Sequence, residues 1–475
     1  MGLTKCQSTR IGDPATNKGI SGGEMKRLAF ASEYITDPMI LLCDEPTSGL
    51  DAFMAQSVVE VMQNMAQHGK SIICTIHQPA SEVFEMFDHI CLLSAGRVAF
   101  HGTTAEALTF FEETGYPCPM NHNPADFFIF TLAIDPSDEE NCKVRSDVIC
   151  TAYGKSARAE EIETIAKYRK PNIHDQSLRT AQELMKTKGV CQSPYRVGWC
   201  IQFEALLRRT LISTIREPLV FVARLIQVFA TAALIAIVFY QQPLNQAGLK
   251  NINAALFMII LVMTIINTYG VIFVFCSEIP IFLREHWNGM YSTDAYFLSK
   301  TIVELPFMIF YAILFDAMVY YAVGLVPDLM HFLWCVLISI MVANASASFG
   351  YLMSTICNNL VLALAVTPPL LVPILLFSGF FLREEVTPWF WKWAKYCSWF
   401  FYGCETLFVN QWMPILDIDN EKNETLFLAD GEQVLMFFGY EQKNFQVDLI
   451  SLLILVVLIR IMAYFFLLLK TYGRK

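Results

Sequence analysis

The 475-residue sequence is poor in charge, and that scarcity is its first informative feature. Charged residues make up 16% of the chain, whereas ordinary soluble domains carry about 25%. Hydrophobic residues reach 55%, and the mean hydropathy is +0.42. A soluble core of this size cannot bury so much apolar surface. The composition therefore indicates a membrane protein, with the lipid bilayer as its first partner.

The sequence also lacks a basic excess and metal-type cysteine spacing. Its formal net charge is −10, which gives no support to a nucleic-acid partner, because such a partner calls for a basic patch. The 14 cysteines form no CxxC pair, so most are interpreted as reduced thiols. Only Cys397 and Cys404 fall where an oxidising exterior is expected. A disulfide between them and two free thiols are both open.

The chain divides into four predicted segments. Residues 1–135 alternate short apolar strands with helical patterns, which is typical of a parallel sheet with crossover helices. Residues 136–198 form a polar linker with one or two surface helices. Residues 199–218 form an amphipathic connecting helix along the inner membrane face, or alternatively an ordinary surface helix. Residues 219–475 form an all-α transmembrane domain. The predicted spans are 220–240, 253–276, 298–323, 329–355, 360–382 and 447–469.

The predicted topology places residues 383–446 outside the membrane, because the first region carries no translocation signal. Asn423 begins a glycosylation sequon in this external loop. The aromatic-rich segment Pro388–Tyr402 is predicted to dip into the outer interface. Asp316 and Arg460 lie inside apolar runs, at depths that differ by about 10 Å. They are therefore not expected to pair, and each is expected to reach toward its nearer membrane surface.

Three short motifs near the N-terminus point to nucleotide chemistry. Ser21-Gly22-Gly23-Glu24 opens a predicted helix whose first N–H groups face an anion. An apolar strand ends in Asp44-Glu45, with Asp51 shortly after it. Asp44 is the candidate Mg²⁺ ligand, acting through water, and Glu45 is the candidate general base. The next strand ends near His77, which is placed to contact a phosphate or the attacking water.

These motifs, I-S-G-G-E, L-L-C-D-E-P-T-S-G-L-D and T-I-H-Q-P, resemble the signature loop, the Walker B strand with D-loop, and the switch histidine of ABC ATPases. A nucleotide-binding region before six spans resembles the White type of the G subfamily of ABC half-transporters. The resemblance covers nearly the whole chain and is weakest at 136–195 and 413–446. Further White-type segments are Arg27–Glu33, Asn123–Phe127, Val342–Asn344, Ser348–Tyr351 and Asn410–Trp412.

The resemblance implies a dimer of half-transporters, either homodimeric or heterodimeric, that uses ATP and Mg²⁺. Ser21, Gly22, Gly23 and Glu24 would contact the nucleotide of the partner. Asp44, Glu45 and His77 would serve this subunit's own nucleotide. Glu45 and His77 would be catalytic, and Asp44 and Asp51 would be nucleotide-binding.

One expected motif is missing from the 475 residues. The sequence contains no G-x-x-x-x-G-K-[ST], and Gly12–Gly19 only approximates it. The region at 1–135 is therefore interpreted as a partial nucleotide-binding domain without Walker A and Q-loop. An incomplete gene reading and a genuine short product are both open, and the chain alone is expected to hydrolyse no ATP.

The resemblance also implies a solute path between the two membrane halves. Its predicted lining residues are Asn267, Thr268, Thr367, Leu375 and Leu376, although Asn267 could equally serve helix packing. Residues 281–292, with Arg284 and Glu285, are predicted to couple the domains or to form a simple turn. The implied function is ATP-driven movement of a small organic solute, with pigment precursors as one class. The alternative is a non-hydrolysing subunit that binds full-length partners. The predicted location is the plasma membrane or a vesicle or granule membrane.

Overall fold

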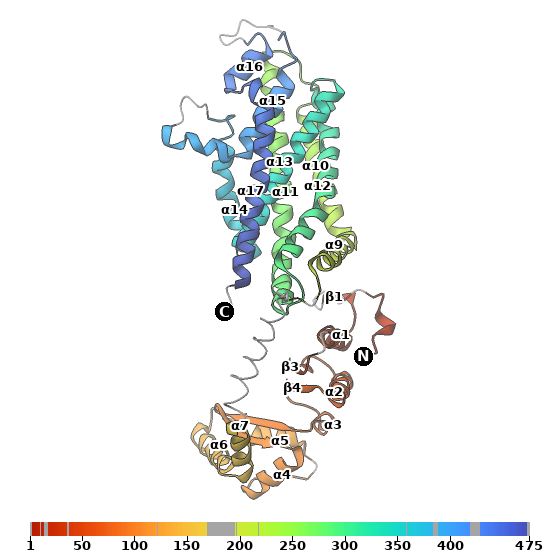
Figure 1. The fold of residues 1–475 in the computed structure, drawn as a ribbon, viewed down its shortest axis with the longest axis vertical. Coiled ribbons are helices and arrows are strands. Elements are labelled where there is room, and N and C mark those ends of the chain that lie inside the picture. Colours follow the sequence, from red (N-terminus) through yellow and green to blue (C-terminus); the bar gives the residue numbers. More distant parts are fainter. Residues whose placement is uncertain are drawn as a thin grey trace, which may run out of the picture. The chain divides into compact units, whose positions relative to one another are not determined.

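The computed structural model describes residues 2–9, 11–13, 18–35, 38–120, 122–168, 195, 197–216, 218–357, 359–382, 388–418 and 428–472 (Figure 1). The chain separates into two compact units, Met1–Val190 and Cys191–Lys475. The first unit is α/β and the second is helical, so the predicted order of fold classes is confirmed. Each unit is described by itself.

The first unit contains short sheets with helices around them. Strands β3 and β4 are parallel and run in register from Ile40 opposite Ser71 to Asp44 opposite Thr75. Strands β5 and β6 are antiparallel, with an irregularity between Leu92 and Leu93. The elements in chain order are η1 (Thr4–Cys6), β1 (Gly12–Asp13), β2 (Lys18–Gly19), α1 (Gly22–Tyr34), β3 (Ile40–Asp44), α2 (Ala52–Gln67), β4 (Ser71–Thr75), α3 (Ser81–Phe84), β5 (Ile90–Ser94), β6 (Arg97–Gly102), α4 (Thr104–Glu113), α5 (Pro124–Leu132), α6 (Glu139–Gly154) and α7 (Ala157–Tyr168).

The β3–β4 pair is covered on one face only. Side chains alternate between the two faces of a strand, and Leu41 on one face packs against the buried residues of α2. The opposite face carries Ile40, Leu42 and Ile73, which are 62%, 74% and 62% exposed. Together these three residues form the open sheet face. In this unit the second core gathers around Phe111, Phe128 and Ile149.

The second unit is a bundle of long helices. Helices α11 and α13 lie side by side in it (Figure 1) and bury more of their apolar windows, 61% and 67%, than α10 or α17, at 17% and 22%. The outer helices therefore present most of their apolar surface to lipid. The helices are α9 (Trp199–Arg216), α10 (Pro218–Val238), α11 (Gln246–Trp287), α12 (Thr293–Val323), α13 (Leu329–Ile356), α14 (Leu360–Leu376), η2 (Trp389–Cys397), α15 (Trp399–Trp412), α16 (Gly431–Phe438), η3 (Gln442–Asn444) and α17 (Phe445–Tyr472).

Among the described residues, five helices are long and apolar enough to cross a membrane. The fifth predicted span, 360–382, is shorter than expected. Its helix α14 has 17 residues and ends at Leu376. Three prolines lie inside it, at 368, 369 and 373. Proline lacks an N–H group and cannot support a regular helix interior, so this span is the least regular of the six.

The predicted external loop is more structured than the sequence analysis suggests. Of the aromatic-rich segment, only η2 is exposed in the predicted way, whereas α15 has 13 of its 14 residues buried. This helix packs against α11, α13 and α17. Trp412 donates from Nε1 to Asn253 Oδ1 at 2.7 Å, and Trp399 donates to Thr264 Oγ1 at 3.2 Å. The interfacial prediction for residues 399–402 is therefore wrong, because the indole N–H groups find partners inside the bundle.

The two ends of the bundle are called the inner end and the outer end. The inner end holds α9, the turn between α11 and α12, and the last residues of α17 (Figure 1). The outer end holds α16 and the turn between α12 and α13. Asn423 lies outside the described residues, so the sequon stays a prediction. Cys397 and Cys404 are free thiols in the structure, the first exposed and the second buried.

Candidate functional site

The N-terminus of α1 is closed by a reciprocal capping box. Ser21 Oγ accepts a hydrogen bond from Glu24 N at 3.2 Å, and Ser21 N donates to Glu24 Oε2 at 2.9 Å. The backbone hydrogen bond from Ser21 holds the pKa of the Glu24 carboxyl below its usual value. Glu24 is therefore ionised and engaged by its own helix, and it is set to stabilise the loop that precedes Gly22.

Gly23 has a packing role as well as a predicted role at phosphate. It is buried, and a Cβ added there would lie 3.0 Å from the sulfur of Met54 on α2. The absence of a side chain therefore lets α1 approach α2 closely. This contact fixes the start of α1 relative to the segment that follows β3.

The ends of β3 and β4 bring the acidic pair together with a threonine. Thr75 Oγ1 donates to Asp44 Oδ1 at 2.6 Å and accepts from the backbone N–H of Glu45 at 2.9 Å. Glu45 adopts a φ of 43°, which is unusual for a residue with a side chain. The strand thus turns sharply after Asp44, and both carboxylates are exposed. Thr75 belongs to the predicted T-I-H-Q-P motif, but no role was predicted for it. Its position opposite Asp44 in a parallel strand pair is the signal that could have predicted their hydrogen bond.

His77 and Asp51 complete the predicted set. His77 lies two residues beyond β4 and is exposed, next to Gln78 with a φ of 49°. Asp51 caps α2, because its Oδ1 accepts from Met54 N at 2.8 Å. The side chain of Asp51 is therefore engaged in local structure. The neighbouring Cys43 is no rival nucleophile, since burial and the Cys74 thiol raise its pKa to about 11.

The described side chains can supply only part of the ligands that Mg²⁺ needs. The described residues contain no group of three or more His, Cys, Asp or Glu side chains that could hold a metal ion. Mg²⁺ commonly binds one or two carboxylates together with waters and substrate phosphates. Asp44 supplies one such carboxylate, with Oδ1 oriented by Thr75. The site therefore fits a cation that arrives with a nucleotide.

Three of the predicted path residues are buried in the helical unit. Asn267 donates to its own helix at Met263 O, at 2.8 Å. Thr268 Oγ1 donates to Ser346 O on α13 at 3.1 Å, and Thr367 donates to Ala363 O at 2.7 Å. Thr268 therefore joins two helices within this chain, which is a packing role. Of the last two path residues, Leu376 is 39% exposed, while Leu375 is partly buried against the core.

A buried ionic cluster on α11, α12 and α13 was not predicted. Lys300 Nζ lies 2.6 Å from Glu278 Oε1 and 3.9 Å from Glu304 Oε1, and the Lys300 side chain is 5% exposed. Tyr351 on α13 donates to Glu304, and Tyr296 donates to Glu278 at 3.1 Å. Lys300 and Glu304 are four residues apart on α12, a spacing visible in the sequence, but Glu278 lies on α11, so only the fold brings all three together.

Arg460 and Asp316 behave differently from the prediction. The described residues show no ion pair between them, as expected. Arg460 is held inside the bundle: its Nε donates to Ser348 Oγ at 3.0 Å and its Nη2 to Asn344 Oδ1 at 3.1 Å. Asp316 is fully buried. The guanidinium of Arg460 does not need to extend to the membrane surface, because α13 supplies its hydrogen-bond acceptors inside the bundle.

The predicted coupling segment is tied to the amphipathic helix α9. Arg209 Nη1 lies 2.8 Å from Glu285 Oε2, and Tyr291 donates to the same carboxylate. Burial opposes the charge on Arg209, yet the hydrogen bonds to Glu285 and Tyr291 hold its pKa above the usual value. Glu285 is thus engaged within the helical unit, so α9 and the turn after α11 are joined.

Comparison with known families and proteins identifies similar sequences over both units. Residues 201–412 match the ABC-2 type transporter family, and residues 77–149 match a second family of the same description. The protein white of Ceratitis capitata is 42% identical over 471 residues, which cover 98% of this chain and 67% of that protein. Protein white of Drosophila melanogaster is 42% identical over 466 residues, or 98% of this chain and 66% of that protein.

A nematode protein is similar over the same extent. The ABC transporter ATP-binding protein/permease wht-1 of Caenorhabditis elegans is 39% identical over 485 residues, covering 100% of this chain and 71% of that protein. The chain thus spans about two thirds of the length of these relatives. Both the α/β unit and the helical unit lie within the matched lengths.

Proposed function

Because the chain belongs to the White-type G subfamily of ABC half-transporters, we propose that it forms one half of a dimeric pump. The pump couples ATP hydrolysis to the movement of a small organic solute across a membrane. Its subunit is an integral multi-pass membrane protein. The observation that carries the proposal is the parallel β3–β4 pair, which sets Asp44, Glu45 and His77 at one edge of a sheet.

In the proposed cycle the residues of this edge act on the subunit's own nucleotide. Asp44 would hold Mg²⁺ through a water molecule, and the ion would neutralise phosphate charge. Glu45 accepts the proton of the attacking water, and His77 donates a hydrogen bond to the terminal phosphate. The exposure of all three side chains and the sharp turn at Glu45 support these roles.

The signature loop acts on the nucleotide of the other subunit. Residues 21–24 begin α1, whose first N–H groups and positive dipole end favour a phosphate anion. The capping box supports this role, because it consumes the side chains of Ser21 and Glu24 and keeps the loop in one conformation. The 475 residues contain no G-x-x-x-x-G-K-[ST], so the phosphate cradle facing this loop is proposed to come from the partner.

We expect the 475 residues alone to show no ATP turnover. With a full-length family member in the same liposomes, vanadate-sensitive turnover should appear. This turnover should take place at the ATP site formed by the partner's phosphate loop and residues 21–24 of this chain. Gly22→Arg, which fills the close approach to phosphate, should abolish that part of the turnover. Glu112→Gln on the exposed side of α4 is the matched control and should change nothing.

Two outcomes would overturn parts of this proposal. Vanadate-sensitive turnover by the 475 residues alone would refute the shared site. Normal turnover with no accumulation of any solute would refute the transport role. A subunit that only binds and inhibits partners is not favoured, because the relatives are transporters.

The solute path is proposed to lie between two helical units. The exposed face of α14 supports this, since Leu376 and Val372 remain 39% and 53% exposed in one chain. Asn267 and Leu375 would border the same path. Cross-linking of cysteines placed at 372 and 376 between two copies or a copy and its partner would test the arrangement; no cross-link in any pairing would contradict it.

A further inference from the structure

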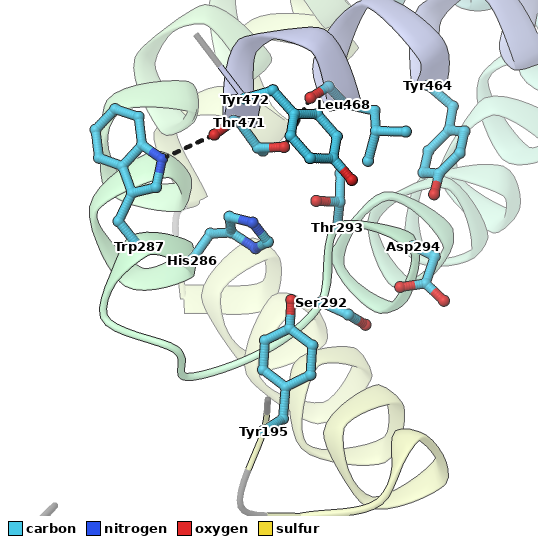
Figure 2. Close-up of a pocket in the computed structure, with 10 residues that line it drawn as sticks. All are labelled: Tyr195, His286, Trp287, Ser292, Thr293, Asp294, Tyr464, Leu468, Thr471 and Tyr472. Carbon is cyan, nitrogen blue, oxygen red and sulfur yellow. Dashed lines mark hydrogen bonds between the residues drawn. The ribbon is translucent and has the colours of Figure 1, made fainter. Parts of the chain in front are cut away.

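The inner end of the bundle contains a pocket with a volume of about 630 Å³. Figure 2 shows its lining side chains converging from the end of α11, the start of α12, the end of α17 and the segment before α9. The volume falls in the range of about 300–1,000 Å³ that small-molecule sites occupy. Ten residues line it: Tyr195, His286, Trp287, Ser292, Thr293, Asp294, Tyr464, Leu468, Thr471 and Tyr472.

The walls of the pocket are rich in aromatic side chains. Four of the ten lining residues are tyrosine or tryptophan, and the Tyr195 ring lies 6.3 Å from the His286 ring, centroid to centroid. Trp287 Nε1 donates to Thr471 O at 3.2 Å, which joins the end of α11 to the end of α17. The aromatic rings carry negative π-faces, which attract cations within about 6 Å.

The charge of the pocket also favours a cation. Asp294 is the only carboxylate among the ten lining residues, and no lysine or arginine is among them. Asp294 Oδ2 accepts from Trp199 Nε1 at 2.7 Å, while Oδ1 accepts no hydrogen bond from the described residues. The carbonyl ends of α11 and α17 add partial negative charge, which exceeds the positive end of α12 alone.

Two hydroxyl groups beside Asp294 have no partner among the described residues. Thr293 is 3% exposed, and its Oγ1 is buried without a hydrogen bond. Ser292 Oγ is in the same state, although Ser292 precedes α12 and could have capped it. A buried hydroxyl without a partner costs about 1–3 kcal/mol. Both residues line the pocket, and a rotation of either side chain would bring its covered hydroxyl to a polar group of a ligand.

We propose that this pocket binds an organic ammonium ion. The ammonium group contacts Asp294 and the faces of the tyrosines, a hydroxyl or carbonyl of the ligand meets Thr293, and an apolar body lies against Leu468. The ammonium group could belong to a free amine or to a lipid headgroup at the membrane surface. The site is separate from the β3–β4 edge and does not depend on ATP.

Equilibrium dialysis of radiolabelled phenethylammonium against the purified full chain, in maltoside detergent without nucleotide, tests the proposal. The probe should bind saturably, whereas radiolabelled 2-phenylethanol, which has the same ring and no charge, should not. Asp294→Asn keeps an oxygen for Trp199 and should weaken binding by up to about fivefold. Tyr472→Leu removes an aromatic face and should weaken it by about two- to fivefold. Glu112→Gln removes a charge from α4, which contributes no lining residue to the pocket, and should leave binding unchanged.

Competition by short-chain lipids separates the two sources of the ammonium group. Competition by diheptanoyl phosphatidylcholine and not by the phosphatidylglycerol analogue identifies a headgroup, and no competition by either identifies a free amine. Equal competition by both lipids shows that acyl chains, not ammonium groups, occupy the pocket, and it overturns the proposal. Equal binding of the probe and 2-phenylethanol to the unmodified chain also overturns it, whatever the variants do.

Discussion

The two units of the molecule treat their polar side chains in opposite ways. In the helical unit, Asn253 and Lys300 are 2% and 4% exposed, and each has a close partner on another element. In the α/β unit, Asp44, Glu45 and His77 are exposed at the ends of strands. Buried pairs fix which helix faces meet, because an unpaired polar group there is costly. Exposed groups remain available to a ligand.

Apolar groups show the complementary difference. Helices α10 and α17 expose most of their own apolar windows, and lipid covers that exposed surface. The open sheet face of Ile40, Leu42 and Ile73 lies in the α/β unit, where lipid offers no cover. The exposed apolar side chains of the bundle are explained by the lipid around them. The exposed apolar side chains of the open sheet face have no lipid around them, so they require another protein surface to cover them.

The largest expected effect comes from the ionic cluster. Lys300→Met leaves Glu278 and Glu304 without their cation, and we expect a loss of about 3–5 kcal/mol in the free energy of unfolding. The loss is measured by thermal unfolding of the detergent-purified chain, in which size exclusion monitors the folded fraction. Adding Glu278→Gln should restore part of the loss, because one uncompensated charge disappears. Purely additive losses in the double variant would argue against a coupled cluster.

A close approach of α11 and α13 gives the next effect. A Cβ at Gly350 would lie 2.7 Å from Thr268 O, so Gly350→Ala should destabilise by about 2 kcal/mol. Gly154 at the end of α6 has nothing within 4 Å of such a Cβ. Gly154→Ala should therefore be neutral or slightly stabilising in the same unfolding assay. A stabilised Gly350→Ala variant would show that the two helices do not meet at this point.

The buried indole of α15 gives a smaller effect. Trp412→Phe removes the donor to Asn253 Oδ1 and leaves that oxygen unsatisfied, at a cost of about 1–2 kcal/mol. Trp389 on η2 is 82% exposed, and Trp389→Phe should change stability by less than about 0.5 kcal/mol. Equal losses in the two variants would contradict the burial of α15.

The smallest effect lies in the α/β unit and depends on pH. Thr103 and Glu106 form a capping box on α4, and the backbone hydrogen bond from Thr103 lowers the pKa of Glu106 from its ordinary 4.5. The ionised carboxylate therefore stabilises the folded state above about pH 4.5, and this contribution is lost as the pH falls through the lowered pKa. Thr103→Ala should cost about 1 kcal/mol.

Hydrogen exchange of the α4 amides in the full chain measures this effect. Protection should fall as acid protonates Glu106, and a Glu106→Gln variant, compared at each pH, should lack that added fall. The same pH dependence in both proteins would assign it to a group other than Glu106.

Much of the fold could be predicted from the sequence because its signals are local. The apolar runs at 220–240 and 329–355 correspond to α10 and α13 within a few residues, since about 20 apolar residues suffice to cross a bilayer. The apolar strand that ends at Asp44 likewise follows from a short pattern.

The remaining features depend on tertiary contacts. The aromatic residues of α15 look interfacial until Asn253 and Thr264 are known to meet them. Arg460 looks stranded until α13 supplies its acceptors. In the candidate site, the strand-end carboxylates were expected, but the bridging role of Thr75 depends on the register of β3 against β4. The pocket at the inner end combines four segments and leaves no linear motif.

Helix α11 has a mechanical consequence beyond its packing. It extends over 42 residues, or about 63 Å, roughly twice the hydrocarbon thickness of a bilayer. Its inner end is linked to α9 through Glu285, and near its outer end Asn253 accepts a hydrogen bond from Trp412. Pro280 lies inside the helix close to the inner end, where it removes one backbone hydrogen bond. The helix therefore has a point near Glu285 at which it can bend, so that a movement of α9 can tilt its inner turns without displacing the whole helix.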